Sequence, residues 1–168
     1  MATKIPEIIN SCAVYVDGVG FIATAASVEN PKIEFEQFEG KSGVAGFKVG
    51  TTILKPMEAK FELNEINFVY FTQAGLRNAL YATIWTKVNT EIDGKVKNVV
   101  FTYRGTIDSL ELPKIELGAE AKCSFTLNTK FFSVLHDKLP LVLVDVDNMI
   151  CALGGVDIWA EHRSFLKG

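Results

Sequence analysis

The stretch from Glu120 to Phe131, EAKCSFTLNTKF, alternates between apolar and polar residues along its whole length. Only a β-strand places alternate side chains on opposite faces, so the segment predicts a long strand with one dry and one wet face. At roughly 3.3 Å per residue it would reach about 40 Å, longer than most strands. The wet face indicates a sheet whose outer side meets water, although any β-sandwich would give the same pattern. The dry face would hold Ala121, Cys123, Phe125, Leu127, Thr129 and Phe131.

The composition fits a compact domain with a core, since 48% of the 168 residues are apolar. Lys and Arg number 17 against 20 Asp and Glu, which gives a net charge of −3. This balance argues against affinity for a nucleic-acid backbone, which needs concentrated positive charge. The opening MATKIPEIINSC lacks the apolar core of a signal peptide, and the longest apolar run, Leu139 to Val144, is too short to span a bilayer. We therefore expect a soluble chain used without a secretion signal.

Apolar-rich and alternating segments predict eight strands in all. Asp17-Gly18 and Asp93-Gly94 are strong turn signals, and each would join two strands into a hairpin. A short helix is predicted over Glu65 to Ala74, which ends before Gly75, and Gly154-Gly155 would separate the last strand from an amphipathic tail. The expected fold is mainly β with one short α-helix, as two packed antiparallel sheets or a barrel. The strands are expected at 8–16, 21–28, 32–38, 57–63, 76–88, 96–110, 120–131 and 139–146.

The segment Gly40 to Pro56 differs in character, with four glycines, three lysines and no acidic residue. A connection this long in a compact domain is usually functional or disordered. Because it also carries Val44, Phe47, Val49, Ile53 and Leu54, it is too apolar for a solvated linker. We predict a loop that becomes ordered against another subunit; the alternative is a loop folded over its own core.

Four segments, 32–38, 57–63, 97–106 and 120–131, have a continuous polar face. Placed in one sheet, they would make a wet wall. Long amphipathic strands in a lone sheet would leave edges open to indiscriminate pairing. Joining of such sheets side by side around a ring would close them into one large barrel, and the polar faces would then line its bore.

Catalytic and metal-binding patterns are missing. His136 and His162 lie far apart in the sequence and in no metal-ligand spacing, and His136 and Asp137 would point to opposite faces of a strand. Gly18-Val19-Gly20 is half of a dinucleotide fingerprint without the helix that should follow. The odd set of Cys12, Cys123 and Cys151 indicates reduced, mostly buried thiols. We expect no enzyme activity, no cofactor and no metal.

The C-terminal run VDVDNMICALGGVDIWAEHR resembles the end of the major tail tube protein of contractile-tailed bacteriophages. Upstream, Pro31 to Gly46 followed by Pro56 to Phe61 is similar to the first wall hairpin and long loop of that family, and Val14 to Gly18 with Gly20-Phe21 fits its beginning. The loop departs from the family in being more hydrophobic and more basic. Tubes of pyocin-type contractile bacteriocins resemble the chain equally well. The motif positions of the tail are Asp145, Asn148, Met149, Gly155, Val156 and Asp157, with His162 and Arg163 resembling one branch.

The resemblance implies a structural subunit that assembles into hexameric rings stacked into a hollow tube. The tube would lie inside a contractile sheath in a virion tail, with tape measure and baseplate proteins as further partners, and would be assembled in the bacterial cytoplasm. DNA would pass through its bore non-specifically. We expect residues 1–168 to form one tail-tube domain with an inter-subunit loop over 40–56 and a C-terminal tail over 147–168.

Two sets of site residues follow. Loop 40–56 and both termini should mediate ring stacking, through Gly43, Val44, Phe47, Val49, Ile53 and Leu54 in the loop. The predicted bore-lining residues are Lys32, Glu34, Glu36, Glu58, Lys60, Glu62, Thr102, Arg104, Lys122, Ser124, Thr126, Asn128 and Lys130.

Three alternatives remain open from the sequence. The same polymer could be the tube of a bacteriocin or injection system. A soluble β-barrel that binds a small apolar ligand would also fit the 12 phenylalanines and the strand count, and it predicts a monomer with an internal cavity. A capsid or baseplate protein of related fold would self-assemble but form no long tube.

Overall fold

The computed structural model describes residues 6–17, 20–66 and 82–168. These residues form eleven strands and one helix, in the order β1 Ile8–Val16, β2 Gly20–Glu29, β3 Phe35–Ser42, β4 Ala45–Leu54, β5 Met57–Leu63, β6 Ala82–Ile92, β7 Lys95–Glu111, β8 Cys123–His136, β9 Leu139–Asp145, β10 Ile150–Leu153, β11 Val156–Asp157 and α2 Ala160–Lys167.

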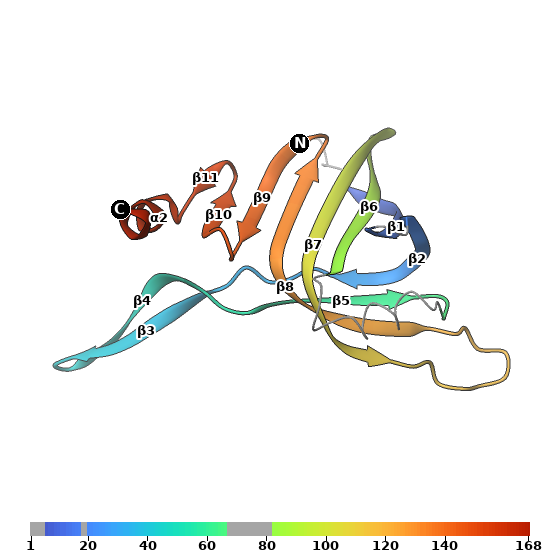
Figure 1. Ribbon diagram of the computed structural model, residues 1–168, viewed down its shortest axis with the longest axis horizontal. Coiled ribbons are helices and arrows are strands. Elements are labelled where there is room, and N and C mark those ends of the chain that lie inside the picture. Colours follow the sequence, from blue (N-terminus) through green and yellow to red (C-terminus); the bar gives the residue numbers. More distant parts are fainter. Residues whose placement is uncertain (1–5, 18–19, 67–81) are drawn as a thin grey trace.

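Six strands close into a barrel in the order β8, β5, β2, β1, β6 and β7, because β7 also pairs with β8. Strands β9, β10 and β11 continue the sheet beyond β8 and lead into α2. Within the described ranges, strands β3 and β4 pair only with each other, and their hairpin projects far from the barrel (Figure 1). The mainly β, barrel-like fold predicted from the sequence is confirmed.

The core of the barrel is filled by the dry faces of the amphipathic strands. Phe61 lies at its centre, stacked on Phe125 at a centroid distance of 4.8 Å and meeting Tyr103 edge-on at 5.1 Å. All three side chains are almost fully buried. Aromatic contacts of this kind add stabilisation beyond the area they bury.

The two longest strands each change direction at a β-bulge. Arg104 pairs with Phe131 but Gly105 pairs with Thr129, so Lys130 is an extra residue in β8. The buried positions of β8 are therefore odd up to Thr129 and even from Phe132 onward. Bulges bend a strand and increase its twist, which lets β7 and β8 each serve both halves of the barrel (Figure 1).

The bulge corrects part of the predicted dry face. Cys123, Phe125, Leu127 and Thr129 are buried as expected. Phe131 lies after the extra residue and is only half-buried on the outer side, with the Arg104 guanidinium 5.0 Å from its ring centre. The strand also begins at Cys123 instead of Glu120, so the exposed Ala121 is not part of it.

Other predicted boundaries also change. The segment 40–56 is not an irregular loop, because most of it belongs to the β3–β4 hairpin. The strand expected over 32–38 begins only at Phe35, and β9 is followed by the short strands β10 and β11. Those strands have four and two residues, too few for alternation to reveal them. The helix predicted over 65–74 and the start of the strand predicted over 76–88 lie largely outside the described residues.

Among the described residues, no helix is long and apolar enough to cross a membrane.

Candidate functional site

A polar wall covers the outer face of one half of the barrel. It is built from β5, the first half of β8, the end of β7 and the end of β2, where Glu62 pairs with Ser124, Lys60 with Thr126 and Glu58 with Asn128. These pairs place the wet faces of β5 and β8 side by side. On the flanks, β2 adds Ser27 and Glu29 to this face, and β7 adds Thr106, Ser109 and Glu111.

The edges of this polar wall carry no ladder partner within the described part of the chain. Residues 106–111 of β7 pair with β8 but not with β6. At the other side, residues 27–29 of β2 pair with β5 but not with β1. Unpaired strand edges are templates for pairing with another chain. Of the four segments predicted to form such a wall, 57–63 and 120–131 supply two of its strands, 97–106 reaches it only at Thr106, and 32–38 is not part of its sheet.

The centre of the wall is neutral and its flanks are charged. Ser124, Thr126 and Asn128 form the central row on β8. Around it, the Lys122 ammonium lies 3.3 Å from the Glu62 carboxylate, and the Ser124 hydroxyl donates to the Glu111 carboxylate at 3.0 Å. Such exposed pairs add little to stability. Their effect is to leave the wall without a concentrated positive charge.

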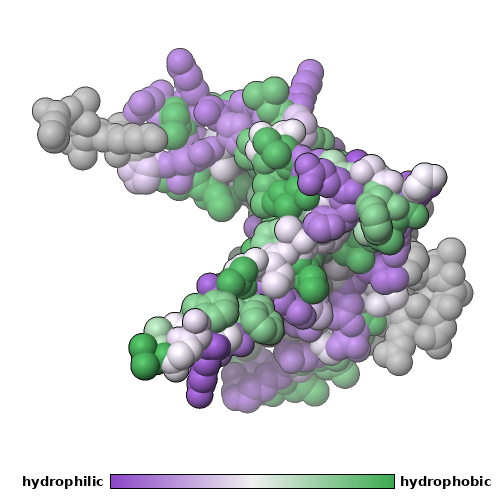
Figure 2. All heavy atoms as spheres, turned by 90° about the vertical axis from the view of Figure 1, so that its left-hand side faces the viewer, coloured by the Kyte–Doolittle hydropathy of each residue, from purple (hydrophilic) through white to green (hydrophobic). Residues whose placement is uncertain are grey.

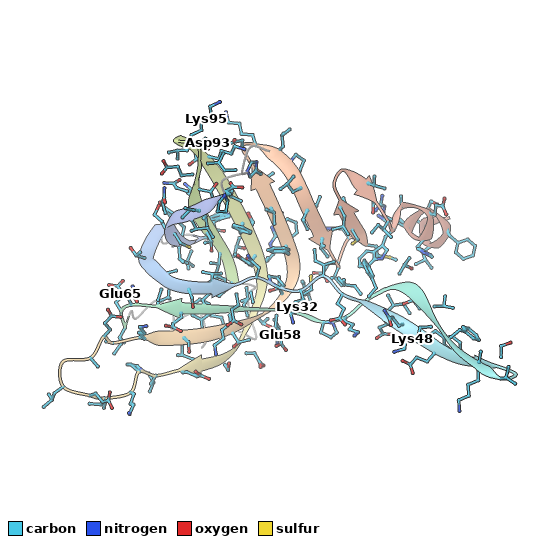
Figure 3. The ribbon with its side chains drawn as sticks, turned by 180° about the vertical axis from the view of Figure 1, so that it is seen from behind. Lys32, Lys48, Glu58, Glu65, Asp93 and Lys95 are labelled. Atoms are coloured by element: carbon cyan, nitrogen blue, oxygen red, sulfur yellow. The ribbon has the colours of Figure 1, made fainter. Side chains whose placement is uncertain are left out.

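A hollow of about 450 Å³ brings further predicted residues to the wall. Lys32 and Glu34, which precede β3, line it together with Glu58, Lys60 and Thr126, and Lys32 and Glu58 lie close together in Figure 3. The segment 32–38 thus reaches the wall without being a strand of its sheet.

The other predicted bore-lining residues lie at or beyond the border of the wall. Thr102 and Arg104 lie on the far side of the bulge, where β7 pairs with β6 and the second half of β8. Lys130 is the bulge residue itself, with its ammonium 3.4 Å from Asp147. Glu36 lies at the base of the hairpin, where its carbonyl accepts a hydrogen bond from the Thr51 hydroxyl at 2.7 Å.

The β3–β4 hairpin is an amphipathic ribbon. Cross-strand pairs put Phe38 with Val49 and Gly40 with Phe47 on one face, and Glu39 with Lys48 on the other. The polar face carries an ion pair of 2.5 Å between Lys48 and Glu39. The apolar face is open to solvent, with Phe38 61%, Phe47 45% and Val49 50% exposed, and Val44 at the tip is fully exposed. An isolated hairpin is marginal in water, so this ribbon has an apolar face that lacks a partner among the described residues.

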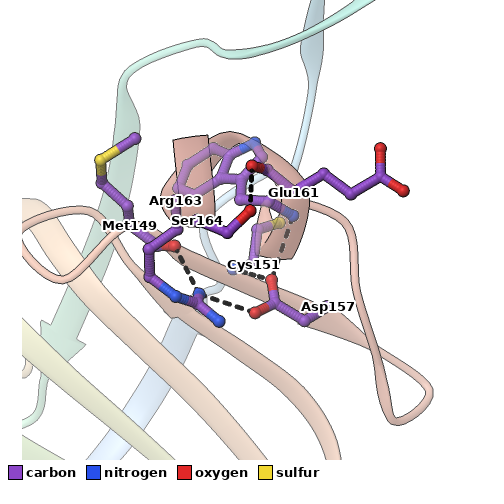
Figure 4. A network of polar contacts seen from close by, with 7 residues as sticks. Met149, Cys151, Asp157, Glu161, Arg163 and Ser164 are labelled. Carbon is purple, nitrogen blue, oxygen red and sulfur yellow. Dashed lines mark hydrogen bonds and ion pairs between the residues drawn. The ribbon is translucent and has the colours of Figure 1, made fainter. Parts of the chain in front are cut away.

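The C-terminal motif residues build a clasp, defined here as residues 145–168. Asp145 accepts hydrogen bonds from both the backbone and the side-chain amide of Asn148, at 3.1 and 2.7 Å, which closes the turn after β9. Further on, one oxygen of Asp157 accepts from the backbone amides of Cys151 and Trp159, while the other lies 2.7 Å from Arg163 (Figure 4). The Arg163 guanidinium beside it holds the pKa of the Asp157 carboxyl below its usual range, against the opposing effect of desolvation.

The clasp holds α2 against the base of the hairpin. The Trp159 indole donates to the Thr52 carbonyl at 2.7 Å, and the His162 ring lies 3.2 Å from the Thr52 hydroxyl. His162 is thus a contact between helix and hairpin. Arg163 also donates to the Met149 carbonyl at 2.8 Å. Gly155, another motif position, adopts the left-handed backbone that the β10–β11 turn needs, with φ of 87°.

An apolar groove of about 840 Å³ lies between α2 and the hairpin base. Ile53, Leu54 and Met57 line one side, and Val146, Met149, Trp159 and Leu166 line the other. Figure 2 shows hydrophobic residues exposed on the side of the molecule from which the hairpin and α2 project. The six predicted ring-stacking residues thus fall into two groups: Gly43, Val44, Phe47 and Val49 on the ribbon, and Ile53 and Leu54 in the groove.

The polar groups considered for catalysis have structural partners instead. His136 lies 3.7 Å from Glu7, while Asp137 accepts from the Asn98 amide at 3.1 Å, so the two neighbours form no dyad. A hydrogen bond from the Thr90 hydroxyl lowers the pKa of Glu7 most, with His136 adding to it. Burial raises the pKa of the Cys12, Cys123 and Cys151 thiols, which favours unreactive thiols. Within the described residues there is no cluster of three or more His, Cys, Asp or Glu fit to hold a metal ion.

Sequence reasoning missed the part that β2 and the end of β7 play in the wall. Ser27, Glu29, Ser109 and Glu111 lie next to bulges, between Ala25 and Ser27 in β2 and between Ile107 and Ser109 in β7. A bulge breaks strict alternation, and a polar face that spans a bulge does not show as alternation in the sequence. The polar residues at 106, 109 and 111 can lie on the same face of the strand only if one residue between 106 and 109 is left out of the alternation. A break of this kind in a polar pattern indicates a bulge.

The comparisons with known proteins agree with this architecture. A structure titled as the cap of the anti-feeding prophage, a tube-terminating cap, has a TM-score of 0.57 at 16% identity, covering 80% of this chain and 93% of that one. The sheath–tube complex of an extracellular contractile injection system called PVC has a TM-score of 0.57 at 15% identity. The match covers 77% of this chain and 90% of that one. At these identities the likeness shows the fold. No curated protein matches the sequence significantly. The family model described as phage tail tube protein FII matches residues 6–166, and the chain therefore belongs to the phage tail tube protein FII family.

Proposed function

We propose that copies of this tail tube subunit assemble into hexameric rings that stack into a hollow tube, with the polar wall turned toward the bore. The family supplies the tube role. The observation that carries the orientation is the wall itself: a four-stranded sheet with a fully hydrophilic outer face, a dry inner face and no ladder partner on its outer edges among the described residues. Joining these edges around a ring would close them and enclose water.

The wall also supports a passage for DNA without retention. The wall carries four acidic side chains and two basic ones: Glu29, Glu58, Glu62 and Glu111, with Lys60 and Lys122. A bore that neutralised many phosphates would hold DNA, because each neutralised phosphate releases counterions and strengthens binding. With more carboxylates than ammonium groups on its face, this wall would let the nucleic acid slide. Tape measure, sheath and baseplate proteins are the further partners that such a tube requires. The similar structures include a sheath–tube complex and a baseplate.

An injection-system tube is a second candidate with its own support. The similar structures come from extracellular contractile injection systems and the anti-feeding prophage. The same polymer would then deliver a cargo other than a genome. Recovery of the tube with its native particle, followed by analysis of what the particle contains, distinguishes the two roles.

The ligand-binding barrel is disfavoured by the packing. Phe61, Phe125 and Tyr103 fill the space between β5, β7 and β8 with ring contacts, where such a barrel would need its cavity. We also infer that the subunit has no catalytic role, in keeping with a structural family.

Electron microscopy of the purified protein in negative stain, with native mass measurement, tests the proposal. We expect rings of six copies and hollow tubes at raised protein concentration. A monomer that persists at high concentration would contradict it.

A further inference from the structure

We infer that Glu7 and His136 form a proton-dependent latch that holds the start of β1 across one mouth of the barrel. The two residues belong to opposite walls, because β1 and β8 are three strands apart in either direction around the closed six-stranded barrel. Glu7 immediately precedes β1, and its carboxylate lies 3.7 Å from the imidazole of His136 at the end of β8. The inference concerns the single subunit and holds whether or not copies assemble into a tube.

The mouth surrounds the Glu7 carboxylate with a hydrogen-bond donor and with positive charge. Thr90 on β6 donates its hydroxyl hydrogen to this carboxylate, and the cross-strand partner of Thr90 on β7 is Lys97. His136 completes the set from β8, where it pairs with the buried Val99. The Thr90 hydrogen bond lowers the pKa of the Glu7 carboxyl most, against desolvation, and His136 and Lys97 lower it further. The carboxylate therefore interacts with groups from three adjacent strands.

Neighbouring charged groups at this mouth have other contacts. Glu91 follows Thr90 on β6, so it points to the opposite face, where it accepts a hydrogen bond from the Asn10 side chain at 2.8 Å. Asp137 accepts a hydrogen bond from the Asn98 backbone amide at 3.1 Å. Further charged residues at this end lie exposed in the two turns (Figure 3): Asp93, Lys95 and Lys138.

The start of β1 has few other contacts to hold it. Before the bulge at Asn10 it pairs with β6 through Ile8 and Ile9, and within the described residues β2 joins β1 only from Ala13 onward. Ile8 and Ile9 are 57% and 67% exposed. A strand end with one neighbour and little buried area opens readily. One added contact therefore changes how often this segment opens.

The strength of the latch depends on pH. A histidine is cationic on the acid side of the range between about pH 5 and 8 and neutral above it. At 3.7 Å the contact of His136 with Glu7 is too long for a hydrogen bond and acts through charge, so it is lost when the imidazole releases its proton. In stronger acid, the contribution of the Glu7 carboxylate, which is present above the pKa of the unfolded chain, about 4.3, is lost as pH falls through the lower pKa of the folded protein. The segment is therefore held most firmly at mildly acidic pH.

Hydrogen exchange of the full-length protein tests the latch, measured by mass spectrometry in a peptide that covers 6–16, below the protein concentration at which tubes form. His136→Gln leaves the sequence of this peptide unchanged, so at one pH the two proteins differ only in how often the segment opens. At about pH 5.5 the unmodified protein should be about two- to fivefold better protected than His136→Gln, the range for partly exposed charge pairs, and at about pH 8.5 the two should be equal.

Glu7→Gln tests the same bridge from its other end. The amide keeps an oxygen for the Thr90 hydroxyl but loses the charge, so after correction for the altered peptide this variant should behave as His136→Gln does. The double variant should lose no more protection than either single one, because both remove the same interaction. The two substitutions lie on different strands, so either one alone decides the test if the other loosens the barrel.

Two carboxylates beside the latch supply the controls. Glu91→Gln removes a charge from the opposite face of β6, and Asp137→Asn removes the one next to His136 in sequence. Both variants should keep the protection gained at mildly acidic pH. A peptide from β5 should exchange equally in every variant, as a check that the effect is local. Equal protection of the unmodified protein and His136→Gln at about pH 5.5 would overturn the inference, as would an acid-side gain that survives in Glu7→Gln.

Discussion

A Cβ atom added to Gly105 would lie 1.9 Å from the carbonyl oxygen of Asn128. Gly105 is the β7 residue next to the bulge at Lys130, and it is buried where the paired strands β7 and β8 bend. The polar wall depends on this bend, because it is here that β7 and β8 pass from one half of the barrel to the other.

Gly105→Ala is therefore expected to be strongly destabilising. The clash is with backbone, which cannot rotate away as a side chain would, so the cost should lie near or above the upper end for overpacking, about 3 kcal/mol. For a chain of this size this corresponds to a fall in Tm of roughly 6–12 °C. Calorimetry of the dissociated protein measures it. Gly50→Ala is the control, because a Cβ there meets nothing within 4 Å. Equal melting temperatures of the two variants would refute the close approach of Gly105 to Asn128.

Much of the barrel could be predicted from the sequence because its strands alternate. The Met57–Leu63 pattern and the Asp93-Gly94 turn are local signals, and both elements appear as expected. The bulge at Lys130 could not be predicted in the same way. It is set by the meeting of β8 with Gly105, two segments far apart in the sequence, and it turns Phe131 from the inner to the outer side.

The hairpin and the clasp depend on strand pairing and on turns that the sequence pattern does not reveal. Segment 40–56 has the glycines of a loop, yet its apolar residues Phe47 and Val49 share one face only through pairing with β3. In the clasp, the resemblance identifies the motif positions but implies no structural role for each side chain. Asp157 accepts hydrogen bonds from two backbone amides and from Arg163. These contacts depend on how the turn folds in three dimensions, which sequence periodicity does not encode.

The clasp should loosen in acid. The pKa of Asp157 is lowered in the folded protein. The ionised carboxylate therefore contributes to stability above the pKa of the unfolded chain, about 3.9, and this contribution is lost as pH falls through the lower pKa of the folded protein. In a Trp85→Phe background, the fluorescence of Trp159 should report this release. Asp157→Asn should remove the acid transition, whereas Asp147→Asn, outside the network, should retain it. An acid transition that is unchanged in Asp157→Asn would assign it to another group.

Tyr103 should resist ionisation until the barrel opens. Burial raises the pKa of its phenol, and its hydroxyl donates to Asn30 at 2.5 Å. The neutral phenol is thus favoured in the folded state. Its contribution to stability is complete below the pKa of the unfolded chain, about 10, and is lost as pH rises through the higher pKa of the folded protein. Tyrosinate absorbance should show one late step, coincident with unfolding, that Tyr103→Phe removes. That variant should cost about 1 kcal/mol for the lost hydrogen bond. A Tyr103 that titrates in the folded protein would show an open barrel.

Deletion of Ser42 to Thr51 should separate folding from assembly. The deleted residues include most of β4 and none of the buried core, so the barrel should keep its circular dichroism and cooperative melting. The ribbon would be gone, and polymerisation should stop. Light scattering at rising protein concentration follows this directly. Normal tubes from the shortened chain would remove the hairpin from the assembly.

The orientation of the wall is tested most directly by a cryo-electron microscopy reconstruction of the assembled tube, read at Thr126. This residue lies in the central row of the wall, paired with Lys60 on one side and Ser109 on the other. The account predicts its side chain in the water-filled bore, at the smallest radius of the subunit. A reconstruction with Thr126 on the outer surface, or packed dry between subunits, would contradict it.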